Sequence, residues 1–567
     1  MTQTAETPPG LYVRMAPDDA AAVEARLEWA RDQDLARRMW AKDHTLWGPE
    51  PEEISNRLGW LSIAGDMLAG LGELEAFVEG VGRDGFTDVA LLGMGGSSLA
   101  PEVLRLSFGT APGYLQLRVV DSTHPDEVGA VADELPLERT LFVVSSKSGG
   151  TLETRSLYAY FRSLVDEGSH FVAITDPGTS LEDLAAKGGF RHTFYGDPAI
   201  GGRYSALSAF GVVPAALMGI DVRELLGRAE LAARAAQAAE PEDNAALWLG
   251  VAIGELARRG RDKLTFVTSE PVSSFGLWAE QLVAESTGKG GTGVVPVAGE
   301  PLGAPSSYGD DRVFAHIRNS ARPDEELEAR MDALAEAGHP VMTVAVRDAA
   351  DLGGHFFSWE FAVAAAGAVL GINAFDQPNV QEAKDRATET IEAFKRDGSF
   401  PETSPDATGG PLAVYGDGSA DSVAQALGDL IKEAGRGRYF ATMAYLPPSD
   451  EADAALTRLR VAVRDAGRAA TTVGYGPRFL HSTGQLHKGG PPSGVFLQVT
   501  AEGRRQIEIP GAGYGFEALV AAQALGDLEA LRSRSLPALR VHIEGDTAAG
   551  LDALAREVET ATESHTA

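Results

Sequence analysis

Short apolar runs that alternate with helix-like stretches fill most of this sequence from residue 87 onward. The first four runs, at residues 88–92, 117–120, 141–144 and 171–174, are each long enough for one buried strand. Strands that are apolar on both faces need cover on both faces, and the intervening helices can supply it. The pattern therefore predicts an α/β fold in which a doubly wound, mostly parallel sheet lies between two layers of helices.

The same alternation returns twice further along the chain. The expected strands of a second unit lie at residues 264–267, 293–297 and 341–345, and those of a third segment lie at 439–443 and 494–498. A chain of 567 residues is long enough for about three or four domains at roughly 150 residues each. We therefore expect more than one sheet.

Changes in composition divide the chain into five expected parts. The first 80 residues mix Ala, Leu, Arg and Glu at helical spacing, which predicts peripheral helices. Polar residues rich in Gly and Pro follow the second unit and predict a linker. The expected parts are an N-terminal helical segment at 1–80, α/β domains at 81–240 and 241–400, a linker at 401–418, and a C-terminal α/β domain at 419–560.

Charge and composition exclude several classes of function. The formal net charge of −32 would repel nucleic acid and anionic membrane, so an anionic substrate must be drawn in by local positive charge. The chain has no Cys, which excludes disulfides and thiolate metal sites. No apolar stretch is long enough for a membrane span, and the first residues lack the features of a signal peptide. We expect a soluble, cytoplasmic protein that binds neither nucleic acid nor membrane.

A hydroxyl-rich glycine turn follows the apolar run at 141–144 and precedes a helix pattern. Unpaired backbone N–H groups at a helix start, together with the helix dipole, favour an anion. Hydroxyls and one lysine ammonium add donors and charge, so a phosphate is the favoured ligand; an ordinary Ser- and Thr-rich helix cap is the alternative. The polar residues of this segment are Ser146, Lys147, Ser148, Thr151 and Thr154.

A second glycine turn, at residues 93–98, lies between the first expected strand and its helix, where open α/β sheets bind ligands. Such a turn lets a small polar ligand approach the backbone, although glycines can also serve the turn alone. A dinucleotide site with Asp121 as the ribose partner is a third possibility. It is the weakest of the three, because Ser98 stands where the dinucleotide fingerprint requires its third glycine.

Three further residues are candidates for chemistry. Arg203 lies in a small-residue loop, and its fork of donors suits an oxyanion or a phosphate. Glu285 falls near the C-terminal end of an expected helix, where the dipole raises a carboxyl pKa and favours a general base. Lys384 lies about two turns into a helix that begins near Pro378. Taken alone, each of these residue types is more often a solvated surface residue.

The order of these motifs resembles the phosphoglucose isomerase family, whose two domains have the sugar-isomerase (SIS) type of doubly wound α/β fold. The shared motifs are Gly-Gly-Ser at 95–97, the Ser-Lys-hydroxyl loop from 146, Gly-Gly-Arg-Tyr-Ser at 201–205, Glu-Ser-x-Gly-Lys at 285–289, and Phe-Asp-Gln at 375–377 with a lysine seven residues after the glutamine. Five motifs in one order form a strong resemblance.

Two more segments, at residues 41–47 and 481–490, resemble the isomerase module of bifunctional transaldolase–phosphoglucose isomerase proteins. With them, the resemblance extends over nearly the whole chain. No segment is long enough for a transaldolase half, so we expect the isomerase alone.

The resemblance implies a glucose-6-phosphate isomerase that forms fructose 6-phosphate by moving a proton between C2 and C1 through a cis-enediol, without metal or organic cofactor. Glu285 would be the base, Arg203 would supply positive charge beside the enediolate, and Lys384 would assist ring opening. The substrate phosphate would bind to the five polar residues from 146 to 154. Gly96 and Ser97 would line the sugar, and Gln377 would position it.

One family feature is missing from its usual place. The family has a ring-opening histidine shortly after a Gly-Glu-Pro element, which is present here at 299–301 without that histidine. His481 or His487, in the C-terminal motif, could take over ring opening; alternatively both serve folding or another group opens the ring. The resemblance also implies a homodimer, in which the C-terminal segment could dock on its own chain or reach a partner's site.

Three alternative functions remain open at this point. A dual isomerase would also accept mannose 6-phosphate. A non-catalytic regulator that binds a sugar phosphate would need the phosphate loop, but not Glu285, Arg203 and Lys384 together. Such regulators commonly carry a DNA-binding segment, and this acidic chain has no basic helix of that kind. An isomerase that has lost its activity is the last possibility.

Overall fold

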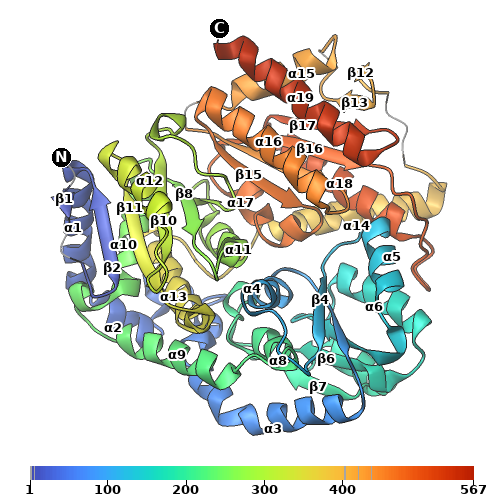
Figure 1. Ribbon diagram of the computed structural model, residues 1–567, viewed down its shortest axis with the longest axis horizontal. Coiled ribbons are helices and arrows are strands. Elements are labelled where there is room, and N and C mark those ends of the chain that lie inside the picture. The colour runs from blue at the N-terminus through green and yellow to red at the C-terminus, as the bar shows by residue number, and fades with distance from the viewer. Residues whose placement is uncertain (1–2, 5–6, 401–403, 419, 436, 567) are drawn as a thin grey trace.

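Three sheets form the framework of the protein (Figure 1). The computed structural model describes residues 3–4, 7–400, 404–418, 420–435 and 437–566, and the side chains at 3–4, 380–384 and 564–566 lie outside this description. Helices and strands alternate within each sheet unit, and the α/β fold with parallel sheets is confirmed. None of the helices in the described part of the chain is both long and apolar enough to cross a membrane.

The first sheet is entirely parallel and has the order β4-β3-β5-β6-β7. Its strands are β3 (Asp88–Gly93), β4 (Gln116–Val120), β5 (Thr140–Ser145), β6 (Phe171–Thr175) and β7 (His192–Tyr195). The strand order reverses at β3, which has β4 on one side and β5 on the other. The helices that follow β3 and β5 therefore diverge. This is the topological switch point where open α/β sheets bind ligands. Both glycine turns, after β3 and after β5, therefore lie side by side at this switch point.

The second sheet has the order β1-β2-β11-β10-β8-β9. Its strands are β1 (Gln3–Thr4), β2 (Leu11–Met15), β8 (Lys263–Thr268), β9 (Val295–Val297), β10 (Arg312–Asn319) and β11 (Val341–Val346). The N-terminal 80 residues, expected to be helical, thus contribute a strand, β2, which pairs antiparallel with β11. Leu11, Val13 and Met15 are buried while the residues between them are not. This two-residue period is the signal of a strand with one covered face.

The third sheet has the order β12-β13-β17-β16-β14-β15. Its strands are β12 (Ala407–Gly409), β13 (Leu412–Tyr415), β14 (Tyr439–Tyr445), β15 (Ala470–Tyr475), β16 (Gly494–Ala501) and β17 (Ala538–Ile543). The stretch 401–418, expected as a linker, contains β12 and β13. Gly410 has a φ of +58° and lies between these antiparallel strands, so the glycine and proline there form a hairpin turn rather than a flexible connection.

The helices cover both faces of these sheets and connect them. Those before the first sheet and around it are α1 (Pro17–Asp32), α2 (Leu35–Trp40), α3 (Ile63–Arg83), α4 (Leu99–Phe108), α5 (Pro125–Glu134), α6 (Leu152–Leu164) and α7 (Ser180–Gly188). Those of the second unit and its approach are α8 (Ala209–Leu217), α9 (Val222–Ala235), α10 (Ala245–Arg258), α11 (Phe275–Thr287), α12 (Glu325–Glu336), α13 (Leu352–Leu370) and α14 (Val380–Asp397). Those of the third are α15 (Val423–Glu433), α16 (Asp450–Gly467), α17 (Gly484–Gly489), α18 (Phe516–Arg532) and α19 (Thr547–Thr566).

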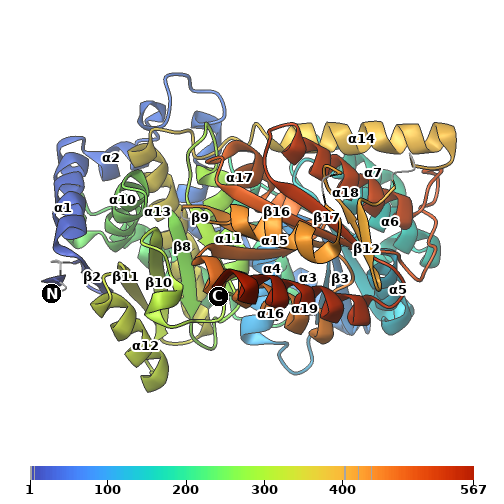
Figure 2. The same cartoon turned by 90° about the horizontal axis from the view of Figure 1, so that it is seen from above.

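The first two units share one continuous apolar core, whereas the third has a core of its own. Helix α13 is buried almost all round and packs against α9 and α10 within the shared core. The third unit docks through smaller apolar clusters, in which Phe516 and Leu519 of α18 lie against the first unit. Figure 2 shows α14 running beside α18, so a helix that follows the second sheet packs on the third unit.

A buried ion pair also connects the second and third units. Glu300, in the Gly-Glu-Pro element, pairs with Arg312 at 3.0 Å, and both side chains are fully buried. The other Glu300 carboxyl oxygen accepts hydrogen bonds from the N–H and hydroxyl of Thr471, at 3.0 and 2.6 Å. This element therefore supports the position of the third unit.

Glu360, on α13, provides a test of the shared core. Its side chain is fully buried, no described residue hydrogen-bonds to either carboxyl oxygen, and burial raises its pKa well above the ordinary value. Between the ordinary pKa of about 4.3 and the raised one, the folded state retains a proton that the unfolded chain has lost. Stability therefore falls by about 1.4 kcal/mol per pH unit in that window.

Glu360→Gln removes this titration. We expect its free energy of unfolding, relative to the unsubstituted protein, to rise as the pH increases from about 5 to about 7.5. Urea titrations at the two pH values measure the difference, and Glu451→Gln at an exposed position is the control. A difference that does not depend on pH would contradict the buried, protonated state of Glu360.

Candidate active site

The hydroxyl-rich loop joins the end of β5 to the start of α6 at the switch point of the first sheet. The hydroxyls of Ser146 and Thr151 lie 2.9 Å apart, and Thr151 stands at the N-cap of α6 without making a capping bond. Thr154 is 1% exposed, and its hydroxyl has no hydrogen-bond partner among the described residues. A helix start with an unpartnered buried hydroxyl is suited to an anion.

Lys147 and Ser148 are arranged differently from the other three residues of the loop. The Lys147 ammonium donates to both carboxylate oxygens of Asp176, at 2.7 and 2.6 Å, and to the carbonyl oxygen of Asp197. Burial lowers the Lys147 pKa, while Asp176 opposes that shift. Ser148 is exposed, and its hydroxyl accepts from the N–H of Gly150. The loop therefore offers hydroxyl groups and a helix start, and its formal charge is already paired.

The glycine turn after β3 touches the loop that carries Arg203. A Cβ atom on Gly96 would lie 2.0 Å from the carbonyl oxygen of Gly202, so only glycine fits at this close approach. Ser97 beside it is buried. Asp121, the residue of the dinucleotide alternative, accepts two hydrogen bonds from Arg478, at 2.8 and 2.6 Å. Those contacts occupy the carboxylate that a ribose would need.

Arg203 is the most highly connected side chain of the site. It is 1% exposed and donates to the hydroxyl of Ser286 at 2.9 Å, a carboxylate oxygen of Glu285 at 3.3 Å and the side-chain oxygen of Gln377 at 2.8 Å. Its remaining nitrogen donates to the carbonyl oxygens of Ala374 and Asp376, at 2.7 and 3.0 Å. The guanidinium thus joins the end of α11 to the loop before α14.

Glu285 lies in the last turn of α11 with its carboxylate facing Arg203. Burial raises its pKa, and the positive charge of Arg203 is the largest effect that opposes the rise. The sequence attributes a raised pKa to the helix end; the structure gives burial as its main cause. A buried carboxylate that remains ionisable beside a cation is equipped to accept a proton.

Lys289 is a member of the site that the sequence analysis did not single out. It is 5% exposed, and its ammonium donates to the backbone and side-chain oxygens of Asp376, at 2.6 and 2.7 Å. Burial lowers its pKa to about 7, and the charge of Arg203 adds to the shift. The sequence signal that could have identified Lys289 is its place as the last residue of the Glu-Ser-x-Gly-Lys motif.

The third unit brings one of the two candidate histidines to this site. His481 follows β15, and its Nε2 lies 2.9 Å from a carboxylate oxygen of Glu153 in the first turn of α6. The same oxygen accepts from the side chain of Gln523 at 2.8 Å, and Gln281 of α11 donates to the carbonyl oxygen of His481 at 2.7 Å. Glu153 is a second residue that the sequence analysis missed, although it lies between Thr151 and Thr154.

His487 is not brought to the site. Its ring packs against Tyr439, Phe479 and Phe496, and neither ring nitrogen has a partner among the described residues. Burial lowers its pKa to about 3, so the ring is neutral. Lys384 belongs to α14, and its side chain lies outside the described part of the chain.

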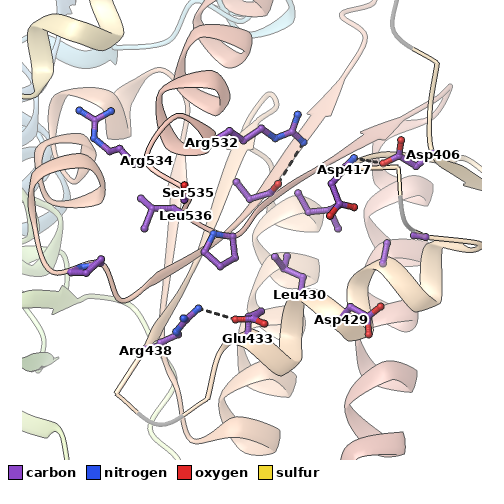
Figure 3. Close-up of a pocket in the computed structure, with 17 residues that line it drawn as sticks. Asp406, Asp417, Asp429, Leu430, Glu433, Arg438, Arg532, Arg534, Ser535 and Leu536 are labelled. Carbon is purple, nitrogen blue, oxygen red and sulfur yellow. Dashed lines mark hydrogen bonds and ion pairs between the residues drawn. The ribbon is translucent and has the colours of Figure 1, made fainter.

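A separate hollow of about 670 Å³ lies in the third unit, between α15 and the segment that leads into β17 (Figure 3). Arg438 pairs with Glu433 at 3.0 Å on one side of it, and Arg532 donates to the carbonyl oxygen of Tyr415 at 2.7 Å. None of the residues of the candidate active site lines this hollow. Within the described residues, no group of three or more His, Asp or Glu side chains is arranged to hold a metal ion.

Comparison with known proteins gives a consistent result. The sequence profile of a family described as phosphoglucose isomerase matches residues 75–298. The chain is 27% identical over 390 residues to the probable glucose-6-phosphate isomerase of Methanococcus maripaludis, covering 61% of this chain and 87% of that protein. It is 30% identical over 364 residues to the glucose-6-phosphate isomerase of Synechococcus sp. (strain JA-2-3B'a(2-13)), covering 55% and 67%.

Two solved structures resemble a large part of this chain. A hypothetical protein from Thermus thermophilus has a TM-score of 0.57 and 27% identity, and the match covers 69% of this chain and 99% of that one. A glucose-6-phosphate isomerase from Chlamydia trachomatis has a TM-score of 0.58 over 71% of this chain and 91% of that one. At 21% identity the second likeness bears on the fold alone.

Thr154→Val tests the anion site without reference to a reaction. Valine has the same shape and lacks the unpartnered hydroxyl, so we expect the thermal stability without anion to be unchanged or higher. Inorganic phosphate should stabilise the variant less, because a hydrogen bond to a charged group is lost and the affinity falls about tenfold or more. Thermal melts over a phosphate titration measure both quantities.

Thr442→Val is the matched control for this experiment, since Thr442 of β14 is also buried with an unpartnered hydroxyl among the described residues. The control should respond to phosphate like the unsubstituted protein. Equal phosphate stabilisation of the Thr154 variant and the control would exclude Thr154 from the anion site.

Proposed function

The chain belongs to the phosphoglucose isomerase family, and we propose that it interconverts glucose 6-phosphate and fructose 6-phosphate with Glu285 as the catalytic base. The observation that carries the proposal is the buried Glu285 carboxylate, held beside Arg203 in a site that also contains an anion-binding helix start. A sugar-phosphate regulator would need the helix start, but it would have no use for a buried base with a charge partner.

The reaction is a proton transfer between neighbouring carbons. In the open-chain aldose, Glu285 removes the proton from C2, and the C–H electron pair forms the C1–C2 double bond while negative charge develops on the C1 oxygen. Arg203 stabilises that charge, which is greatest in the transition state. Glu285 then returns the proton to C1, while the proton of the C2 hydroxyl passes to the C1 oxygen and the C2 oxygen becomes the ketose carbonyl. Burial favours this role, because it raises the Glu285 pKa toward the pH at which a base works best.

The rest of the substrate is held by groups that do not react. In this proposal the phosphate lies at the start of α6, where Ser146, Thr151 and Thr154 supply hydroxyl donors. Lys147 and Ser148 stabilise the loop. The positive charge of Lys147 near the phosphate is offset by its ion pair with Asp176. Gly96 and Ser97 line the sugar, and Gln377 positions it from its hydrogen bond to Arg203.

We assign ring opening to His481. Its imidazole lies against Glu153, which can orient the ring. A proton on His481 is transferred to the ring oxygen as the bond between C1 and the ring oxygen breaks, and the C1 hydroxyl gives its proton to water as the C1 carbonyl forms. Lys384 assists this step by the family resemblance. The homodimer and the cytoplasmic location belong to the proposal on the same ground, together with the acidic composition.

Glu285→Gln tests the assigned base. We expect kcat to fall by about 10² to 10⁴, the usual contribution of a general base, while KM changes little because the phosphate is held by the first unit. A coupled assay of fructose 6-phosphate conversion measures kcat, and exchange of the C2 proton with D2O measures the transfer itself. The same assay with mannose 6-phosphate tests the dual-isomerase alternative.

Glu280→Gln is the matched control, because Glu280 lies on the same helix five residues before Glu285. It should retain activity close to that of the unsubstituted protein. If Glu285→Gln keeps more than about a tenth of the activity, the contribution is below that of a general base and the assignment is wrong.

His481→Ala tests the ring-opening step. We expect turnover of cyclic glucose 6-phosphate to fall by about 10², whereas a tetrose 4-phosphate, which lacks the free hydroxyl needed to close a ring, should be converted at nearly the same rate. Glu153→Gln should give the same selective loss, and His487→Phe, which keeps an aromatic ring in the core, should give none. Equal losses on both substrates would contradict a ring-opening role.

A further inference from the structure

The third unit places a second polar side chain against the catalytic segments, four residues after His481. Gln485, on α17, is fully buried. Its side-chain oxygen accepts from the backbone N–H of Asn379 at 2.9 Å. Its side-chain nitrogen donates to the carbonyl oxygen of Gly288 at 2.9 Å and to the side-chain oxygen of Asn379 at 2.8 Å. One amide therefore joins two segments that are about 90 residues apart in the chain.

The two segments that Gln485 joins carry the proposed chemistry. Gly288 directly follows α11, three residues after Glu285, and Asn379 comes two residues after Gln377. Arg203 and Lys289 also fasten the loop at residues 374–379, through hydrogen bonds to the carbonyl oxygen of Asp376. Of these three fastenings, Gln485 is the one that comes from the third unit.

We infer that Gln485 is a positioning residue, which holds the end of α11 and the loop before α14 in the register that proton transfer requires. The inference rests on the proposed function of Glu285 and Gln377. It gives the third unit a role in catalysis beyond His481, exerted within the same chain.

Close packing supports a fixed position for this contact. A Cβ atom on Gly288 would lie 2.5 Å from the Cα of Leu486, and one on Gly489 would lie 2.2 Å from the side-chain oxygen of Asn379. The backbone N–H of Gly291 donates to the carbonyl oxygen of Gly489 at 3.0 Å. The backbone of α17 thus packs directly against both segments, which leaves Gln485 little freedom to rearrange.

Helix α17 is also held in place by contacts with the rest of the third unit. Lys488 pairs with Asp527 of α18 at 2.5 Å, and both side chains are 1% exposed. Arg534 donates to the carbonyl oxygen of Lys488 at 2.9 Å. A displacement of α17 would break a buried ion pair, which is costly once the charges are out of water. The third unit therefore provides Gln485 with a rigid support.

The expected consequence is a change in kcat rather than in KM. When the Gln485 bonds are lost, Glu285 and Gln377 lose their relative placement, and a misplacement of about 1 Å costs about 10² in rate. The phosphate loop lies at the start of α6 and makes none of the contacts described for Gln485. Substrate binding through the phosphate should therefore persist.

The first experiment compares Gln485→Leu with Gln498→Leu. Gln498 is an equally buried glutamine of the third unit, and its side-chain nitrogen donates to the carbonyl oxygen of Ala524 within that unit. We expect Gln485→Leu to lower kcat about ten- to a hundredfold with KM within about twofold, and Gln498→Leu to lower neither. Equal kcat values for the two variants, or a loss that appears only in KM, would overturn the inference.

Gln485→Glu supplies a second readout, the pH dependence of kcat, which would not change if Gln485 had a merely structural role. The ionised glutamate still accepts from Asn379 but cannot donate to Gly288, whereas the protonated form can donate. Because burial raises a carboxyl pKa, the ratio of its kcat to that of the unsubstituted protein should rise as the pH is lowered. A ratio that stays constant across the pH range would count against the inference.

Amide hydrogen exchange separates this inference from the proposed function. Gln485→Leu should speed exchange of the Asn379 N–H, which loses its acceptor, and Gln498→Leu should not. If the unsubstituted protein has no isomerase activity but Gln485→Leu speeds exchange of the Asn379 N–H, the positioning contact stands and the proposed function is refuted. If the unsubstituted protein is active but Gln485→Leu leaves this exchange unchanged, the positioning contact is refuted.

Discussion

The buried guanidinium of Arg203 is the interaction on which the candidate site depends. It donates to five acceptors from the end of α11 and the loop before α14, so its position determines where both segments lie. A buried arginine is tolerated only when its donors are satisfied and its charge is paired. The close approach of Gly96 to Gly202 fixes the loop that carries Arg203, and a larger residue there would displace it.

The same guanidinium balances the charges around Glu285. Burial raises the pKa of Glu285, and the positive charge of Arg203 is the largest influence that opposes the rise. Lys289 has the opposite situation, since burial and the charge of Arg203 both lower its pKa, to about 7. The site therefore combines a base that accepts protons readily with an ammonium group that loses one near neutral pH. Such opposed shifts are typical of sites where protons move.

Most of the fold could be predicted from the sequence, because the inner strands are continuous apolar runs. The run at 141–144 forms most of β5, and its glycine turn leads into α6 as expected. The strands that were missed include β2 and the β12–β13 pair, which are short and antiparallel toward the sheet edges, where one covered face gives a weaker signal. Four parallel strands were missed as well, β7, β10, β15 and β17. In β10, the middle strand of its unit, charged and polar residues at 312, 316 and 318 interrupt the apolar run. Proline and glycine near β13 also serve a hairpin and a loop equally well.

The candidate site was predictable in its residue types but not in its pairings. Glu285, Arg203 and Gln377 come together as the motif order indicates. Whether His481 or His487 belongs to the site depends on which ring lies outside the aromatic core of the third unit, and the sequence gives no indication of that. Likewise, the pairing of Lys147 with Asp176 arises from the neighbouring strand β6, which no local pattern around Lys147 could reveal.

Those pairings change how an acidic protein can bind an anionic substrate. With a net charge of −32, the chain needs local attraction for a phosphate, and Lys147 was the obvious source. Its charge is matched by Asp176, so in the proposed function the loop attracts a phosphate through hydroxyls and the start of α6, which act at short range. Two further positive groups, Arg203 and Lys289, lie near Glu285 instead. In the proposed function, formal charge is thus concentrated where the reaction generates it, while neutral groups hold the end of the substrate that does not react.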